Sequence, residues 1–245
     1  MSESVLTVFF YASLTALATG LGALPFLFFK KISRKWLGYS NAVAGGLMLT
    51  ASFTLIFEGL HYGLWKTVFG ILLGLVFILV SDNWLEKQEG LSISNLKGAD
   101  ARKAILIVGV MTVHSFTEGV GVGVSFGGDA GLGIFITAAI AIHNIPEGLA
   151  ISLVLVPRGM RVFTAALYCV FSSLPQPVMA VPSYLFVETF RPVLPVGLGF
   201  AAGAMIWMVF SEIIPEANEK ASTKWIGVII AISVVMMIIF QEFLR

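Results

Sequence analysis

Long, nearly uncharged apolar runs follow one another along this chain and restrict it to a membrane fold. A helix that crosses a bilayer needs about 20 mostly apolar residues. Because the runs are continuous and do not alternate apolar with polar side chains, they favour helices over the strands of a barrel. The sequence predicts an all-α polytopic membrane protein with eight transmembrane helices, at residues 7–29, 41–60, 67–80, 104–126, 132–156, 162–186, 192–214 and 224–243.

The composition is typical of an integral membrane protein. Of its 245 residues, 58% are hydrophobic and 12% are charged, whereas about a quarter of the residues of a soluble domain are charged. So few polar side chains cannot cover a globule of this size, and we expect the lipid bilayer to surround it. The net charge of +1 is too weak to indicate a nucleic-acid partner. Cys169 is the single cysteine, which excludes an internal disulfide and a cysteine-rich zinc module.

The basic residues indicate how the helices are oriented. If the amino terminus lies outside, twelve of the 15 lysines and arginines fall in turns that face the cytoplasm and three fall outside, as the positive-inside rule requires. We therefore expect an integral protein of the plasma (inner) membrane with both termini outside the cytoplasm. Residues 1–245 form a single transmembrane domain, and residues 81–103 form a cytoplasmic loop between the third and fourth helices.

A short sequence pattern occurs twice, in two helices that would run in opposite directions. The second helix contains AGGLM at residues 44–48 and the seventh contains AAGAM at residues 201–205. Helices 1–3 and 6–8 would then be inverted three-helix repeats around helices 4 and 5, a plan common in transporters. The alternative is that small residues and methionine recur because they suit packed membrane helices, and the pattern alone does not decide between the two.

Two pairs of ionisable residues lie near the middle of predicted helices. The fourth helix carries His114 and Glu118, and the fifth carries His143 and Glu147. A spacing of four residues places both members of a pair on one helix face. Because consecutive helices are antiparallel and joined here by a short glycine-rich turn, the two pairs can meet at the same depth.

Carboxylates in the hydrocarbon region need a compensating charge. Each acidic side chain there costs about 2.5 kcal/mol or more on insertion scales. Two carboxylates and two imidazoles carry a charge of −2 and offer two nitrogen and two oxygen ligands, which suit a divalent transition metal better than Ca²⁺ or Mg²⁺. The alternatives are that each pair is a polar contact that holds helices together, or that the pairs form a proton relay.

Further candidate residues lie beside these pairs and at the helix ends. Ser115 and Asn144 follow the two histidines and could line a second metal position or hydrogen-bond a metal's water. Met48 is either a soft ligand or part of the core. Acidic groups at the two mouths of a path would attract a cation, and we expect Glu216 to be a solvated helix end. The candidates for such a path are Glu58 and His61 at the outer end of the second helix and Glu212 at the inner end of the seventh.

The segments HSFTEG at residues 114–119 and HNIPEG at residues 143–148 resemble the paired signatures of the ZIP (Zrt/Irt-like) divalent metal transporter family, in its GufA-like branch. With the helix count and chain length, the resemblance covers nearly the whole chain. It implies uptake of Zn²⁺ as the transported substrate, with Fe²⁺, Mn²⁺ and Cd²⁺ open, by inverted repeats around helices 4 and 5, often in a homodimer. It also implies a primary transport site made by His114, Glu118, His143 and Glu147. In the same resemblance Met48 is a candidate added ligand and Glu212 corresponds to an exit-side carboxylate.

The chain departs from that family's pattern at several positions. Ser115 and Thr117 stand where GufA-like members usually carry asparagine and proline, and Ser211 stands where a histidine is frequent. Gln176 stands where a glutamate is common before the proline of the sixth helix, so the second metal position, bordered by Ser115 and Asn144, loses a charge. The loop at residues 81–103 has no histidine.

Two other classes of protein would also bury histidine and glutamate. An intramembrane zinc-dependent hydrolase would use metal-bound water, but the chain has no HExxH motif and no recognisable nucleophile motif. A proton-coupled solute carrier would use the pairs as a relay and would need no metal. We therefore predict that the protein transports a divalent metal ion and is not an enzyme.

Overall fold

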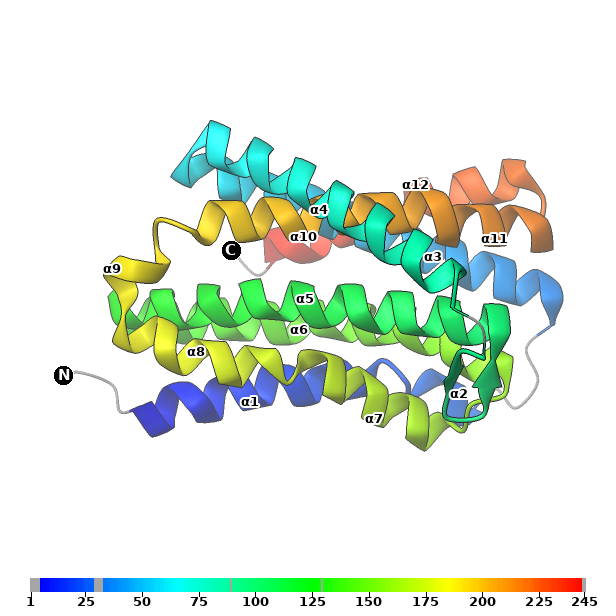
Figure 1. The fold of residues 1–245 in the computed structure, drawn as a ribbon, viewed down its shortest axis with the longest axis horizontal. Coiled ribbons are helices and arrows are strands. Elements are labelled where there is room, and N and C mark those ends of the chain that lie inside the picture. Colours follow the sequence, from blue (N-terminus) through cyan, green and yellow to red (C-terminus); the bar gives the residue numbers. More distant parts are fainter. Residues whose placement is uncertain (1–4, 29–32, 89, 129, 244–245) are drawn as a thin grey trace.

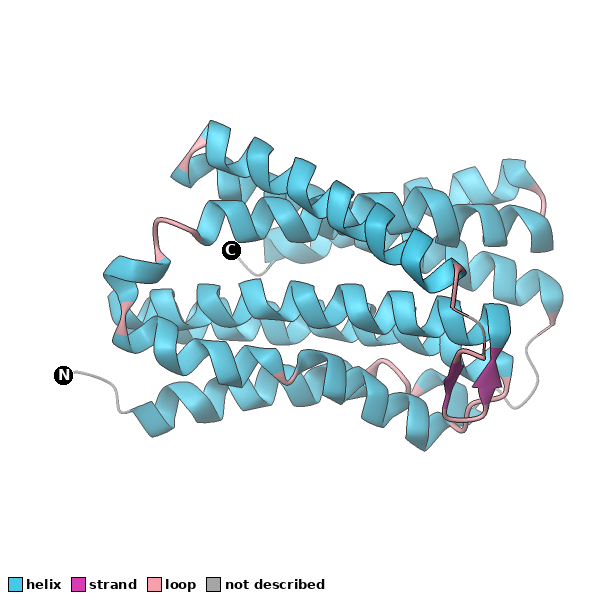
Figure 2. Cartoon of the chain, viewed as in Figure 1, coloured by secondary structure: helices cyan, strands magenta, loops and turns pink. Residues whose placement is uncertain are grey.

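The computed structural model describes residues 5–28, 33–88, 90–128 and 130–243, and this part of the chain is almost entirely helical. Figure 2 shows helices throughout, with one small strand pair at one end of the bundle. In chain order the elements are α1 (Val5–Leu21), α2 (Pro25–Phe28), α3 (Arg34–Tyr62), α4 (Leu64–Glu86), β1 (Ser92–Ile93), β2 (Leu96–Lys97), α5 (Gly98–Gly128), α6 (Ala130–Leu155), η1 (Val156–Arg158), α7 (Val162–Ser173), α8 (Pro175–Leu185), α9 (Val187–Phe190), α10 (Leu194–Met208), η2 (Val209–Ile213), α11 (Ile214–Lys220) and α12 (Thr223–Phe243).

The prediction of an all-α membrane protein is confirmed. Among the described residues, seven stretches are long and apolar enough to cross a membrane, and a shorter apolar helix at Thr223–Ile239 follows them. The third stretch, Leu64–Glu86, extends beyond the predicted residues 67–80 at both ends. The predicted loop at residues 81–103 is correspondingly shorter, because α4 continues to Glu86 and α5 begins at Gly98. Between them, β1 and β2 pair in antiparallel register.

Several of the membrane stretches are not single regular helices, and two of them are interrupted beside a proline in the second half of the chain. The stretch Val162–Leu185 consists of α7 and α8, which meet at Leu174 just before Pro175. Proline has no N–H to donate to the preceding turn. In the stretch Leu194–Lys220, α10 passes into α11 through the π-helical turn η2, which ends just before Pro215. Turns of this kind are frequent at functional sites.

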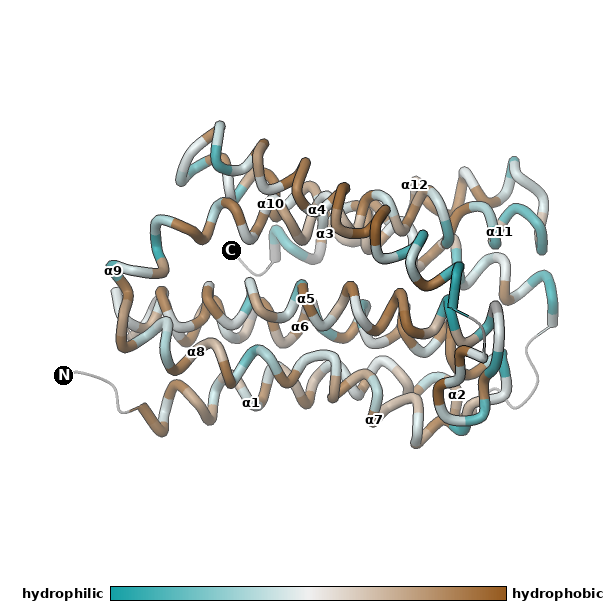
Figure 3. The backbone as a smooth tube through the Cα atoms, in the orientation of Figure 1, coloured by the Kyte–Doolittle hydropathy of each residue, from teal (hydrophilic) through white to brown (hydrophobic). Residues whose placement is uncertain are grey.

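The helices form two groups on either side of a central pair. In Figure 1, α5 and α6 lie side by side along the middle, with α1, α7 and α8 on one side and α3, α4, α10, α11 and α12 on the other. Figure 3 shows that hydrophilic segments gather near the ends of the helices, including the end that carries the strand pair, whereas hydrophobic colour dominates the lengths between them. This distribution is the one expected of helices that cross a bilayer.

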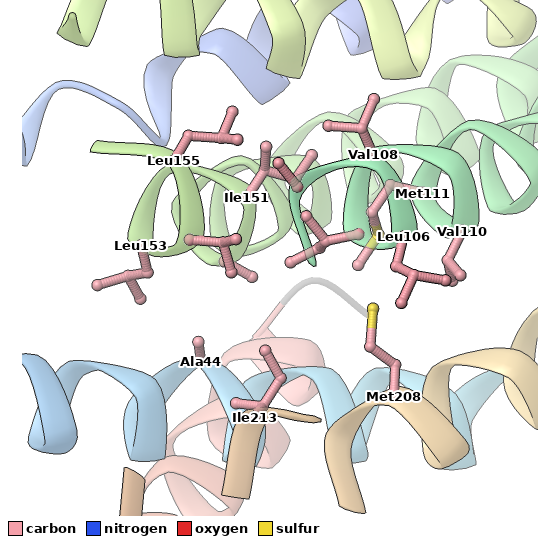
Figure 4. Packing of buried hydrophobic residues seen from close by; sticks show 14 of the residues in the cluster. Ala44, Leu106, Val108, Val110, Met111, Ile151, Leu153, Leu155, Met208 and Ile213 are labelled. Atoms are coloured by element: carbon pink, nitrogen blue, oxygen red, sulfur yellow. The ribbon is translucent and has the colours of Figure 1, made fainter. Parts of the chain in front are cut away.

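The main hydrophobic core fills the boundary between the central pair and the second group. Figure 4 shows Ala44 of α3 and Met208 of α10 facing Met111 of α5 and Ile151 of α6, and all four side chains are buried. Large apolar side chains also cover the outside of the bundle, where lipid would contact them; Trp65, for example, is 80% exposed. Close packing therefore holds the helices together, since apolar surface gains nothing by leaving lipid.

Candidate metal centre

Three ionisable side chains meet where α5 packs against α6. The Nε2 atom of His114 lies 2.9 Å from Glu147 Oε1 and 3.5 Å from Glu118 Oε1. One potential ligand atom from each of the three residues lies within 4.8 Å of the other two. The imidazole is fully buried, and Glu118 and Glu147 are 5% and 2% exposed. Among the described residues, this is the one group of three or more such side chains with the spacing to hold a metal ion.

The helical spacing of the sequence produces this arrangement. His114 and Glu118 are one turn apart on the unbroken helix α5, so both face α6. Glu147 projects from α6, which continues through Pro146 without ending. His143 lies one turn before Glu147 on the same helix, and its side chain is outside the part of the structure that is described.

Two glycines of the paired motifs allow other helices to approach this cluster closely. A Cβ atom on Gly148 would lie 1.7 Å from the carbonyl oxygen of Thr19 in α1. A Cβ atom on Gly119 would lie 2.6 Å from the carbonyl oxygen of Gln176 in α8. No side chain fits in such contacts. The glycines that follow Glu118 and Glu147 therefore bring α8 and α1 against the cluster.

A hydrogen-bond network occupies the side of the cluster that faces α1 and α8. Gln176 is fully buried; its Nε2 donates to Glu118 Oε2, and its Oε1 accepts from the hydroxyl of Thr15 and from Asn144 Nδ2. The same Asn144 amide group donates to the carbonyl oxygen of Thr15 over 2.8 Å. Within the described part of the chain, the buried Asn144 Oδ1 and Ser115 Oγ atoms have no hydrogen-bond partner. Thr15 escaped the sequence analysis, although Thr15 and Thr19 are polar residues on one face of an apolar helix.

Three other predicted residues belong to α3. Met48 is buried in the same hydrophobic core as Met111 and Ile151, which are one turn from His114 and Glu147 respectively. Glu58 and His61 are exposed on the last turns of α3, and His61 Nδ1 lies 2.8 Å from the carbonyl oxygen of Phe57. The structure therefore brings neither of these two outer residues into the buried cluster.

Acidic and basic side chains form a second cluster at the end of the bundle near the strand pair. Lys103 of α5 lies 2.9 Å from Glu212 Oε2 and 3.0 Å from Glu216 Oε2. Arg158 Nη2 donates to both carboxylate oxygens of Glu216, each over 2.9 Å, and Lys220 also pairs with Glu216. Glu216 is only 5% exposed, so the prediction that it is a solvated helix end is wrong. Two of its three cationic partners, Lys103 and Arg158, come from distant parts of the chain.

A polar cavity opens beside this second cluster. Its volume is about 220 Å³, and its lining includes Lys103, Arg158 and Glu212. Successive turns of α5 carry Lys103, Ile107, Met111 and then His114 on one face. Ile107 and Met111 are almost completely buried. Two apolar turns therefore separate the cavity from the histidine and carboxylate cluster.

The donor set of the central cluster has the chemistry of a transition-metal site. Zinc binds imidazole nitrogen at about 2.0–2.1 Å and carboxylate oxygen at about 2.0–2.2 Å, so neighbouring ligand atoms around one ion are roughly 3.4 Å apart. The His114 contacts of 2.9 Å and 3.5 Å lie close to that separation. Small side-chain movements would therefore suffice to admit an ion between His114, Glu118 and Glu147.

Comparison with known proteins gives matches of one kind. The family model described as ZIP zinc transporter matches residues 81–181. A protein of Arabidopsis thaliana named as a proposed zinc transporter is 48% identical over 237 residues, which cover 96% of this chain and 38% of that protein. The zinc transporter GufA of Myxococcus xanthus is 32% identical over 223 residues, covering 84% of this chain and 86% of GufA. The zinc transporter ZupT of Clostridium perfringens is 29% identical over 252 residues, covering 89% and 88%. This chain thus spans less than half of the plant protein and most of each bacterial one.

Proposed function

This chain belongs to the ZIP zinc transporter family, a family of transport proteins and not of enzymes, and from that premise we propose that it carries divalent transition-metal ions across the membrane. Zinc is the principal substrate that we propose, since the similar proteins are named for it. The family resemblance of HSFTEG and HNIPEG is confirmed by these relatives. The alternatives, an intramembrane hydrolase and a metal-free solute carrier, are not favoured.

The observation that carries the proposal is the buried cluster of one imidazole and two carboxylates between α5 and α6. Two carboxylates at this depth need a counter-charge, and a divalent ion supplies one that neutralises both. We propose that His114, Glu118 and Glu147 bind the ion and that His143, one turn from Glu147, supplies a fourth ligand. Met48 is a candidate additional ligand from α3.

Ser115 and Asn144 are proposed to border the bound ion. Both side chains are buried, and each has an oxygen without a hydrogen-bond partner among the described residues. Such oxygens can accept hydrogen bonds from water that the ion retains, and partners of this kind orient the direct ligands.

The transport path that we propose leads from Glu58 and His61 at the outer end of α3, through the cluster, to Glu212 at the inner end. The apolar turns at Ile107 and Met111 close the inner half of that path, so the two helix groups must move relative to each other to release the ion. The gathering of basic residues near the strand pair supports a cytoplasmic position for that end. Uptake across the plasma membrane with both termini outside, inverted repeats, and a homodimer are part of the proposal.

Uptake of radioactive zinc into proteoliposomes tests this function. We expect Glu147→Ala and His143→Ala to abolish uptake without loss of membrane insertion, because each removes a proposed ligand. Glu188→Ala is the matched control, since Glu188 is exposed on α9. Uptake at the wild-type rate by both ligand variants would remove the proposed site. Hydrolysis of a lipid amide or peptide by the pure protein, or solute flux that needs no metal, would favour the alternative classes.

A further inference from the structure

Gln176 of α8 connects a proposed metal ligand, Glu118, to residues of two further helices, α1 and α6. It follows Pro175 at the start of α8 and has no exposed surface. Its amide group links Glu118 of α5, Asn144 of α6 and Thr15 of α1. Residues fully buried among ionisable groups are held by the hydrogen bonds that they make, since an unpaired polar group there destabilises the fold.

The neighbours of this amide group fix its orientation. Asn144 Nδ2 donates to the carbonyl oxygen of Thr15, so it can only present a hydrogen towards Gln176. The Glu118 carboxylate can only accept. Rotating the Gln176 amide by half a turn would set two N–H groups against each other at Asn144 and two oxygens against each other at Glu118. The oxygen of Gln176 must therefore face Asn144 and Thr15, and its nitrogen must face Glu118.

The same count of donors and acceptors shows that the amide oxygen of Gln176 is engaged by protein groups and is not presented to a metal ion. A carboxamide oxygen has two lone pairs. Asn144 donates to that oxygen, and the single hydroxyl hydrogen of Thr15 is shared between it and the carbonyl oxygen of Ala12. The bond from Gln176 Nε2 occupies Glu118 Oε2, whereas Glu118 Oε1 faces His114. Glu118 thus presents Oε1 to the cluster, while Gln176 engages its Oε2 from the side of α8.

We infer that Gln176 is a positioning residue that holds Glu118 for a single divalent ion, so that the site carries one ion per chain. This inference rests on the proposed function. One divalent ion balances the two carboxylates to a net charge of zero. A second ion would leave a charge of +2 in a buried site, which is strongly unfavourable without further anionic ligands.

The residue type at position 176 then decides how many ions the site accepts. A glutamate there would place a third carboxylate against Glu118, with no N–H to donate to it. Three carboxylates with two divalent ions carry a net charge of +1, so the glutamate would favour a second ion where the glutamine excludes it. Gln176 therefore determines stoichiometry without touching the ion.

Equilibrium zinc binding to the full-length, detergent-purified protein tests this inference, with the number of ions per chain and the Kd as readouts. We expect one zinc ion per wild-type chain and a second ion in Gln176→Glu. Gln176→Ala should keep one ion but bind it roughly 10–100-fold more weakly, the usual effect of removing a group that orients a metal ligand. Thr15→Val, which removes a donor to Gln176 from the side away from the ion, should keep one ion with a smaller loss of affinity.

Two results would overturn the inference. One is a wild-type protein that binds two zinc ions and loses one in Gln176→Ala, which would make Gln176 a ligand. The other is an unchanged Kd in both Gln176→Ala and Thr15→Val together with one ion in Gln176→Glu. If Gln176→Ala does not fold, Thr15→Val and Gln176→Glu still decide. Failure of the proposed function itself would look different: either the wild-type protein would take up no zinc into proteoliposomes, or zinc uptake would persist in Glu147→Ala, whatever residue position 176 carries.

Discussion

The buried carboxylate of Glu216 provides a quantitative test of the packing between the two helix groups. It receives two hydrogen bonds from Arg158, and Lys103 and Lys220 also pair with it. Lys103 belongs to α5, whereas Glu216 belongs to α11. One acidic side chain therefore pairs with three cations and connects the central helix pair to the second group.

We predict that Glu216→Gln lowers the free energy of unfolding by about 3 kcal/mol. Removing one partner of a buried ion pair costs about 3–5 kcal/mol because the other charges stay buried. The lower end applies here, because Arg158, Lys220 and Lys103 are 12%, 19% and 22% exposed and recover some hydration. In addition, Lys103 still pairs with Glu212 in this variant, and Arg158 still pairs with the exposed Asp100.

Thermal unfolding in detergent, followed by tryptophan fluorescence, measures this effect. With a shift of about 2–4 °C per kcal/mol for a chain of this size, the expected fall in Tm is about 6–12 °C. Glu219→Gln is the matched control, because Glu219 is exposed on the same helix and surface changes usually stay within about 0.5 kcal/mol. A Tm for Glu216→Gln within 2 °C, about the effect of a surface change, of that control would refute the reasoning.

Two further predictions concern the helix contacts and the ion. Gly148→Ala should prevent the close approach of α1 and destabilise the protein by about 3 kcal/mol or more, since its Cβ would lie 1.7 Å from the Thr19 carbonyl oxygen. Gly121→Ala is the control: its Cβ meets nothing within 4 Å, so this variant should gain about 1 kcal/mol of helix propensity. Equal Tm values for the two variants would contradict the packing. Zinc at 100 times its Kd should stabilise the wild type by about 2.7 kcal/mol, and chelation should reverse the Tm shift; the double variant Glu118→Ala/Glu147→Ala should show no shift, and a shift of wild-type size in it would exclude the cluster as the binding site.

The helical architecture was predictable because apolar runs of membrane length have one stable solution in lipid. The helix ends were less predictable. Hydropathy falls at Ser81 and Asp82, yet α4 continues to Glu86, and Asp82 pairs with Arg102 of the next helix. A hydropathy pattern reports where lipid ends, whereas hydrogen bonds and ion pairs decide where a helix ends.

The candidate site was also predictable only in part. The four-residue spacing within each motif, together with the short turn between the two helices, predicted that His114, Glu118 and Glu147 could meet, and the structure brings these three side chains together. The contacts of Gln176 with Thr15 and the burial of Glu216 depend on residues far away in sequence, brought near by the break before α8 and by the packing of α5 against α11. No local pattern contains that information.

The most direct test of the central claim is the position of zinc itself, from the anomalous diffraction of crystals grown with the metal. We predict one strong peak per chain between α5 and α6, about 2.0–2.2 Å from a nitrogen of His114 and from oxygens of Glu118 and Glu147. A well-occupied peak found only elsewhere, with His114 still 2.9 Å from Glu147 at saturating zinc, would contradict the account.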